Sequence, residues 1–314
     1  MDVLLGDIGG THARFARASG PGRIEHILVL EVADYGDLET AIADYLDRTA
    51  GPLPARAAFA VAGPVGDGEV AMTNIPWKIS ARGLVRRFGF ADVRLVNDFV
   101  AVALAIPGLD AGTRRPIGGG AAVADAPAAV LGPGTGLGVA ALVPTPAGPV
   151  ALASEGGHAT LAAATPEEDR ILARLRDRFG HVSAERVLSG PGLEALHAVL
   201  AGNRAIPSRA VEIGTRAAAG TDPEAARTVA AFCAFLGSFA GNLVLTLGAR
   251  NGLYIAGGIV PALADVLARS AFRERFEAKG RFASYLKTIP TYVIVHPQPA
   301  LLGLSLLTAR NPGN

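Results

Sequence analysis

Short apolar runs separated by polar turns fill the first hundred residues, and this pattern is typical of strands joined by tight connections. The runs that read as strands cover residues 3–5, 13–18, 24–32 and 57–62. One segment instead repeats apolar side chains at helical spacing, namely Leu38, Ile42, Tyr45 and Leu46. Residues 63–80 read as a long loop, and Ser80 is placed to cap a helix over residues 81–88.

The rest of the chain alternates strand-like runs with longer helical segments. Strands are predicted over residues 129–131, 138–143, 253–256 and 292–295. Helices are predicted over residues 165–179, 193–200 and 301–310. Between the halves, residues 107–127 are rich in Gly, Pro and Ala and are the best candidate for a hinge or boundary. This order of elements predicts an α/β protein with mixed sheets covered by helices.

An uncharged segment, residues 228–249, is long enough to cross a bilayer. It is also rich in Ala and Gly and contains Ser238 and Asn242, which favours a helix buried in a large domain. Its aromatic side chains would then form one packing stripe, made of Phe232, Phe235 and Phe239.

The segment LVNDF, residues 95–99, combines an apolar run, a polar tip and a second apolar run. We read this as a strand, then Asn97 and Asp98, then a helix. Ligands of open α/β sheets bind at the carboxyl ends of strands, so Asp98 is a candidate catalytic base. A competing interpretation makes Asp98 the cap of the helix that begins at Phe99.

Two strand–turn–strand segments contain glycine and threonine at the turn. The first holds Asp7, Gly9, Gly10 and Thr11, and the second holds Gly134, Thr135 and Gly136. Glycines let backbone N–H groups approach an anion, and Asp7 could hold Mg²⁺ through water. A plain hairpin turn remains an alternative for the first segment. Two halves that open in this way suggest a duplicated fold with one nucleotide between them.

Two common nucleotide motifs are absent from the sequence. There is no G-x-x-x-x-G-K-[ST] segment, and the glycines at 134 and 136 lack the later glycine of a G-x-G-x-x-G fingerprint. An ordinary P-loop and a dinucleotide site are therefore disfavoured.

Further polar and glycine positions could contact a ligand. Glu155 and His158 flank two glycines, and two such ligands are too few for a metal site. On spacing alone, Glu185 reads as a first-turn acid rather than a ligand contact. Gly257 and Gly258 follow a strand and precede a helix, where a nucleotide can approach the backbone, and a plain turn between strand and helix is an equal alternative. Three acids at the start of one predicted helix read as solvated partners of its dipole, namely Glu167, Glu168 and Asp169.

Composition narrows the class of protein. The chain has 314 residues, enough for two domains, and a net charge of +1 without a basic stripe. Nucleic acid and anionic membrane are therefore not expected as partners. Cys233 is the single cysteine, which excludes an internal disulfide and a Cys-rich zinc site and fits the cytoplasm. The first residues, MDVLLGDIGG, do not resemble a signal peptide.

Seven segments together resemble the bacterial glucokinases of the hexokinase family, within the actin-like ATPase superfamily. They are LLGDIGGTHARFA, AGPVGDGEVAMTNIPW, LVNDFVAVA, LGPGTGLGVA, SEGGHATLA, SAERVLSGPGL and YIAGGI. The resemblance spans nearly the whole chain. It implies a two-domain, ribonuclease H-like duplicated fold with an interdomain cleft, a small domain of residues 1–109 plus 301–314, and a large domain of residues 110–300.

The resemblance also implies roles for individual residues. Asp98 matches the catalytic base, and the sugar contacts match Asn74, Asn97, Asp98, Glu155, His158 and Glu185. The first phosphate segment matches Asp7, Gly9, Gly10 and Thr11, the second matches Gly134, Thr135 and Gly136, and the adenosine segment matches Gly257 and Gly258. For Glu185 the resemblance reverses the interpretation drawn from spacing alone.

The implied reaction is transfer of the γ-phosphoryl group of ATP, bound with Mg²⁺, to the 6-hydroxyl of glucose. The family also implies a homodimer. Alternatives are a kinase of fructose, mannose or an amino sugar, and a non-kinase, actin-like ATP-binding sugar sensor. A strand that starts at Val3 leaves no room ahead of it for a DNA-binding helix-turn-helix. Kinases and repressors with a Cys-rich zinc motif are disfavoured because Cys233 stands alone.

Overall fold

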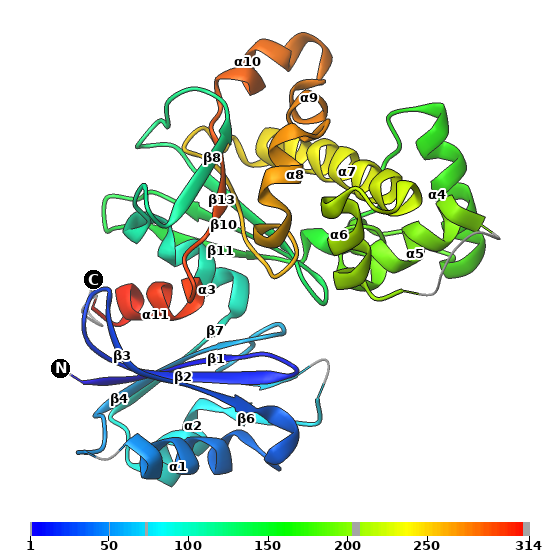
Figure 1. The fold of residues 1–314 in the computed structure, drawn as a ribbon. Helices are drawn as coiled ribbons and strands as arrows, with labels where there is room; N and C mark the ends of the chain where they lie inside the picture. Colours follow the sequence, from blue (N-terminus) through cyan, green and yellow to red (C-terminus); the bar gives the residue numbers. More distant parts are fainter. Residues whose placement is uncertain (1, 50, 73–74, 203–207, 310–314) are drawn as a thin grey trace. The chain divides into compact units, whose positions relative to one another are not determined.

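The computed structural model in Figure 1 describes residues 2–49, 51–72, 75–202 and 208–309. Contacts divide the chain into two compact units. The first contains Met1–Asp110, Thr145–Ala153 and His296–Asn314, and the second contains Ala111–Pro144 and Ser154–Val295. The boundaries expected from the sequence, at residues 109/110 and 300/301, stay a prediction.

A five-stranded sheet organises the first unit, in the order β3-β2-β1-β4-β7. Its strands are β1 (Val3–Ile8), β2 (His12–Gly20), β3 (Arg23–Glu31), β4 (Arg56–Val61) and β7 (Asp92–Asn97). The first three strands pair antiparallel, whereas β1, β4 and β7 run parallel. The polar ends of β1 and β7 consequently lie at the same edge of the sheet.

Helices cover both faces of this sheet (Figure 1). One face carries α1 (Leu38–Thr49) and α2 (Ala81–Phe88), and the other carries α3 (Asp98–Ala105) and α11 (Pro299–Ala309). Ser80 caps α2 by accepting a hydrogen bond from the backbone N–H of Gly83, as the sequence predicts. The core between α1, α2 and the sheet contains large side chains that are fully buried, among them Phe15, Tyr45 and Phe59.

The prediction of one long loop over residues 63–80 is wrong. This segment contains a small antiparallel hairpin of β5 (Glu69–Ala71) and β6 (Lys78–Ser80). Val70 and Ile79 face each other across it and are buried with Trp77. Strands of three residues carry too few alternating positions to show a periodic pattern.

A six-stranded sheet organises the second unit, in the order β11-β10-β9-β12-β13-β8, although residues 150–153 of its edge strand β11 are grouped with the first unit. Its strands are β8 (Arg114–Gly118), β9 (Ala128–Pro133), β10 (Leu137–Val143), β11 (Val150–Ser154), β12 (Gly252–Ile255) and β13 (Thr291–Ile294). β9 and β10 pair antiparallel, and β9, β12 and β13 run parallel. β8 was not expected within residues 107–127, because its sequence RRPIG has no apolar run.

The two sheets share one topology. In each, an antiparallel hairpin (β1–β2 or β9–β10) leads into two parallel strands (β4 and β7, or β12 and β13) on the side of its first strand. The mixed sheets and the duplicated fold expected from the sequence are thereby confirmed.

Seven helices of the second unit pack beside its sheet among the described residues. They are α4 (Pro166–Phe179), α5 (Gly190–Ala201), α6 (Ala210–Ala219), α7 (Pro223–Leu247), α8 (Ala264–Arg269), α9 (Phe272–Glu277) and α10 (Ala283–Thr288). Two differences from the sequence prediction stand out. α6 was not predicted, and Gly190-Pro191-Gly192 forms the first turn of α5 rather than a loop before it.

The helix α7 is long and apolar enough to cross a membrane, and it is the one described helix with this length and composition. Most of its apolar window is buried inside the protein, and Phe232, Cys233 and Phe235 belong to the core. Phe239 is partly buried against the same core. The helix is therefore accounted for by packing, as expected.

Glu168 corrects the expectation that all three acids at the start of α4 are solvated. Thr165 caps this helix as predicted, but the Glu168 side chain is buried. Its carboxylate lies 2.8 Å from the Arg275 guanidinium and accepts a hydrogen bond from the backbone N–H of Ala164. A buried carboxylate needs such a partner, and this one lies 107 residues away along the chain.

Candidate active site

The carboxyl end of β7 presents Asn97 and then Asp98, the first residue of α3. The Asn97 side-chain oxygen accepts hydrogen bonds from the backbone N–H groups of Phe99 and Val100, at 2.9 and 3.3 Å. Its amide group donates to the carbonyl of Gly63. Asn97, and not Asp98, is thus the cap of this helix, so the capping interpretation of Asp98 is wrong.

Asp98 lies in the first turn of α3, where backbone N–H groups point toward the end of the helix. One of its carboxylate oxygens accepts a hydrogen bond of 2.9 Å from the N–H of Phe99. A helix N-terminus stabilises negative charge. This place therefore suits a negatively charged side chain.

The first glycine turn joins β1 to β2, as predicted. Its geometry is closed by a hydrogen bond from the N–H of Gly9 to the carbonyl of His12, at 3.0 Å. Asp7 is the next-to-last residue of β1, and its carboxylate lies 3.5 Å from the guanidinium of Arg14 on the neighbouring strand. Burial raises the pKa of Asp7, and Arg14 offsets part of that increase.

The second glycine turn, between β9 and β10, is built against α5. The N–H of Gly134 donates to the carbonyl of Gly136, and the N–H of Gly190 donates to the carbonyl of Gly134, each at 2.8 Å. The beginning of α5 is consequently attached to this turn. Gly190 has no side chain that a sequence pattern could single out, so its contact with the turn is visible only in the fold.

Gly257 brings the end of β12 to the same turn. Its φ of +85° favours glycine, and a Cβ there would overlap the carbonyl oxygen of Pro133, the last residue of β9. Gly258 has open space around its Cα. The second phosphate segment and the adenosine segment predicted from the sequence therefore lie side by side within the second unit.

Glu155, His158 and Glu185 also come together within the second unit. The His158 imidazole lies 3.9 Å from the Glu155 carboxylate and 3.8 Å from the Glu185 carboxylate. Glu155 and His158 are well exposed, whereas Glu185 is 31% exposed. Two carboxylates and an imidazole in this arrangement can accept several hydrogen bonds from one polyhydroxylated molecule.

Glu185 connects these three side chains to the second glycine turn. Its carboxylate accepts a hydrogen bond of 2.9 Å from the backbone N–H of Leu137, and a Cβ on Gly136 would lie 2.5 Å from the same oxygen. Glu185 is therefore not a free first-turn acid. The glycine at position 136 is needed to admit the carboxylate.

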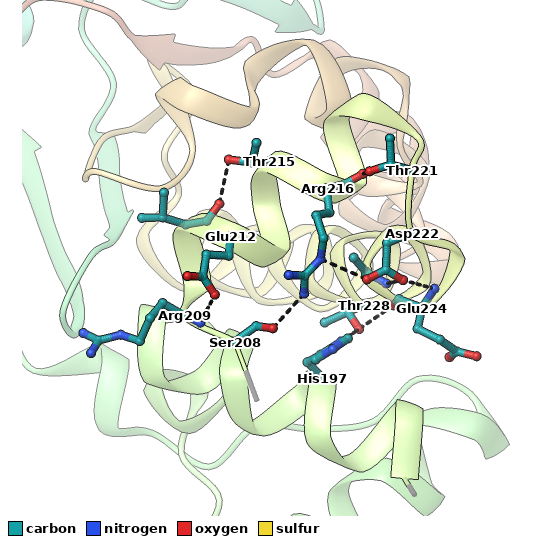
Figure 2. A network of polar contacts seen from close by, with 12 residues as sticks. His197, Ser208, Arg209, Glu212, Thr215, Arg216, Thr221, Asp222, Glu224 and Thr228 are labelled. Carbon is teal, nitrogen blue, oxygen red and sulfur yellow. Dashed lines mark hydrogen bonds and ion pairs between the residues drawn. The ribbon is translucent and has the colours of Figure 1, made fainter. Parts of the chain in front are cut away.

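A polar network holds α5, α6 and α7 together next to this turn (Figure 2). Arg216 of α6 donates to Asp222, the cap of α7, and to Ser208, while His197 of α5 hydrogen-bonds Thr228 of α7. The position that a Cβ on Gly190 would take lies 3.8 Å from the Cβ of Ala210, the first residue of α6. The network thus fixes a helix terminus beside the second glycine turn.

One predicted site residue lies outside the described part of the chain, and three residues at the site were not predicted. Asn74 lies outside the described residues. No sequence pattern singles out Arg14, Leu137 or Gly190, because each acts through a backbone group or a residue on another segment. Among the described residues, no group of three or more acids, histidines or cysteines could hold a metal ion.

Known proteins resemble this chain over nearly its whole length. A family model described as glucokinase matches residues 4–311. A glucokinase of Aromatoleum aromaticum is 51% identical over 305 residues, which cover 96% of this chain and 92% of that protein. The crystal structure of a glucokinase from an Antarctic psychrotroph superposes with a TM-score of 0.88 at 38% identity, covering 98% of each chain.

Some relatives are longer than this chain. The bifunctional protein glk of Paraburkholderia xenovorans is 46% identical over 315 residues, which are 99% of this chain but 49% of that protein. The chain therefore spans about half the length of the bifunctional relatives. Since the glucokinase model covers nearly all of the sequence, this chain belongs to the glucokinase family.

Proposed function

We propose that this chain catalyses the ATP-dependent phosphorylation of glucose at its 6-hydroxyl, with Asp98 as the general base. Family membership supports the reaction, and the position of Asp98 supports the role. The single observation that carries the role is that Asn97 caps α3. The cap therefore does not explain the carboxylate at position 98, which stands at the carboxyl end of a parallel strand.

In the proposed reaction, the 6-hydroxyl oxygen of glucose attacks the γ-phosphorus of ATP as the bond to ADP breaks. The Asp98 carboxylate accepts the hydroxyl proton, and such a base typically contributes about 10²- to 10⁴-fold in rate. Asn97 orients the same hydroxymethyl group. Positioning and charge stabilisation supply the remainder of the rate enhancement.

The ring hydroxyls of glucose are assigned to Glu155, His158 and Glu185, with Asn74 as a further contact. The imidazole of His158 lies 3.9 Å from the Glu155 carboxylate and 3.8 Å from the Glu185 carboxylate, so these side chains are near enough to contact one ligand. Charged acceptors form the stronger hydrogen bonds with hydroxyl donors. Glu185 is held by the N–H of Leu137, which orients its carboxylate before the sugar arrives.

The phosphates of ATP are assigned to the two glycine turns, Asp7 to Thr11 and Gly134 to Gly136, and the adenosine to Gly257 and Gly258. Mg²⁺ bound with ATP offsets phosphate charge when it is present. Asp7 fits a place beside the hydrated ion, because Arg14 compensates only part of the effect of burial on the pKa of its carboxyl group. A single carboxylate suits contact through water rather than a cage of protein ligands.

The test of the base is Asp98→Asn, measured by coupled ADP formation with glucose. We expect kcat to fall by about 10² or more while glucose binding is retained. Asp92→Asn is a matched control, because Asp92 begins the same strand and pairs with Arg94. Near-parental kcat in Asp98→Asn would show that another group takes the proton.

The same assay with a panel of hexoses and a no-sugar control tests the substrate. Fructose, mannose and amino sugars are the alternatives to glucose, and ATP consumption without sugar would indicate an ATP-binding switch instead.

We further propose a cytoplasmic homodimer. Cys233 is buried in α7, and burial raises the pKa of its thiol to about 11. A buried, free thiol is compatible with a reducing compartment. Light scattering on the protein as it elutes from a size-exclusion column measures the oligomeric state.

A further inference from the structure

A basic pocket lies in the second unit between α4, α5 and the start of α7. It has a volume of about 280 Å³ and is lined by Glu167, Arg170, Ile171, Arg174, Val199, Leu200 and Arg227. Figure 1 shows these three helices next to one another, and α5 packs against both α4 and α7. None of the lining residues belongs to the candidate active site.

The charges around this pocket are unbalanced. Three guanidinium groups line it, and among its described lining residues one carboxylate, Glu167, opposes them. That carboxylate lies 2.7 Å from Arg227, so one of the three positive charges is paired. Arg174 donates to the carbonyl of Val199, which fixes its guanidinium at the rim without neutralising it.

Arg170 and Arg174 stand one helical turn apart on α4. Like charges at this spacing repel each other and destabilise a helix. A bound anion would remove this repulsion. The apolar side chains of Ile171, Val199 and Leu200 supply a floor on which carbon atoms of the ligand can pack.

We propose that this pocket binds a small dianionic phosphate ester, with the phosphoryl group between Arg170 and Arg174 and its carbon body over Val199 and Leu200. Guanidinium groups bind phosphate oxygens in pairs and retain their charge at all physiological pH values. Ligand pockets usually measure about 300–1,000 Å³, so this one suits a small metabolite better than a nucleotide.

The pocket is connected to the active site through α5. Gly190, the first residue of α5, is attached to the second glycine turn, while Val199 and Leu200 near its other end line the pocket. Nine residues of helix span about 14 Å. A ligand at the pocket therefore acts on the far end of a helix whose first turn supports the nucleotide segment.

The test is calorimetric titration of the full chain with glucose 6-phosphate, chosen because it carries a dianionic phosphoryl group on a six-carbon body. The parent should show a class of sites that Arg170→Gln/Arg174→Gln lacks, since losing two charge-assisted contacts weakens binding by about 100-fold. Glu167→Gln should bind several-fold more tightly, because it removes the opposing carboxylate. Arg176→Gln, an exposed arginine of α4 outside the lining, should titrate like the parent.

Identical isotherms for the parent and the double variant would overturn the proposal. Inorganic phosphate that binds this class of sites as tightly as glucose 6-phosphate would also overturn it, because the carbon body would then contribute nothing. Arg170→Gln alone should still weaken binding about tenfold if the double variant does not fold. Asp98→Asn should leave this class of sites unchanged, so the pocket and the proposed reaction fail or succeed separately.

Discussion

Asp7 combines a proposed binding role with an electrostatic cost at the scale of one residue. Burial raises the pKa of its carboxyl group, and Arg14, 3.5 Å away, compensates only in part. The folded state therefore binds this proton more readily than the unfolded chain does. Stability consequently falls as pH rises from the ordinary value of 3.8 through the raised value, and the cost persists at neutral pH.

We expect Asp7→Asn to remove this cost. At pH 7 the variant should unfold at an equal or higher urea concentration than the parent, and the difference should shrink at pH values below 3.8, where both side chains are neutral. The kcat with MgATP should fall, because the proposed partner of the hydrated ion is lost. Urea unfolding from about pH 3 to about pH 8 measures the first effect. A variant that is clearly less stable at pH 7 would show that the attraction to Arg14 outweighs burial.

Asn97 carries two structural duties beside the proposed base, since it caps α3 and donates to the carbonyl of Gly63. Asn97→Ala removes both and should lower the free energy of unfolding by about 1–2 kcal/mol. Asn97→Asp keeps the cap oxygen, so it should recover most of that stability.

Activity separates the structural role of Asn97 from its proposed role in orienting the sugar. Asn97→Asp places a second carboxylate next to Asp98 and removes the amide donor, so its kcat should stay low although its fold is restored. Chemical denaturation and initial rates on the same preparations measure the two quantities. If activity returned together with stability, capping would be the whole contribution of this residue.

At the scale of elements, α7 is determined by close packing against α9. A Cβ on Gly237 would overlap the carbonyl oxygen of Phe272, and a Cβ on Gly241 would lie 2.5 Å from that of Phe276. Small residues along one helix therefore admit the backbone of the other. This packing explains the uncharged, glycine-containing sequence of residues 228–247 of α7 without a membrane.

Gly237→Ala tests that explanation. Alanine is better than glycine in a helix by about 1 kcal/mol, but overpacking a core costs about 1–3 kcal/mol, so a net loss of stability is expected. Gly214→Ala in α6 is the matched control, because its Cβ would meet Leu263 at an ordinary 3.5 Å. The control should be neutral or stabilising. Equal thermal midpoints for the two variants would mean that α7 and α9 are less tightly packed.

At the scale of the whole molecule, the residues proposed for one glucose belong to both units. Asn97 and Asp98 lie in the first unit, and Glu155, His158 and Glu185 lie in the second. Phosphoryl transfer also requires that water be kept from the γ-phosphate. Sugar binding should therefore draw the two units together.

Small-angle scattering measures this closure. We expect the radius of gyration to decrease at saturating glucose, and the decrease to disappear in Glu185→Gln, which loses a ring contact of the second unit. Asp98→Asn should still close, because it keeps the hydrogen-bonding shape of the side chain. A radius that is unchanged by glucose in the parent would exclude closure as part of the mechanism.

Much of the fold could be predicted from the sequence, because its signals are local. The two glycine hairpins, the caps Ser80 and Thr165, and the buried character of α7 all follow from residues within one or two turns of each other. The family motifs also identified Asp98, Asn97 and the segment 257–258. Short or weakly apolar strands such as β5, β6 and β8 were missed because they provide too few positions for a periodic signal.

Contacts between distant segments were decided only by the tertiary structure. The sequence alone determined that this chain has two similar halves, each opening with a glycine turn, and an acid at the end of a strand. Folding decided that Asn97 caps α3, that Glu185 binds the N–H of Leu137, and that Glu168 is buried against Arg275. Burial and hydrogen bonding depend on neighbours in space, and the partners of both glutamates lie more than forty residues away along the chain.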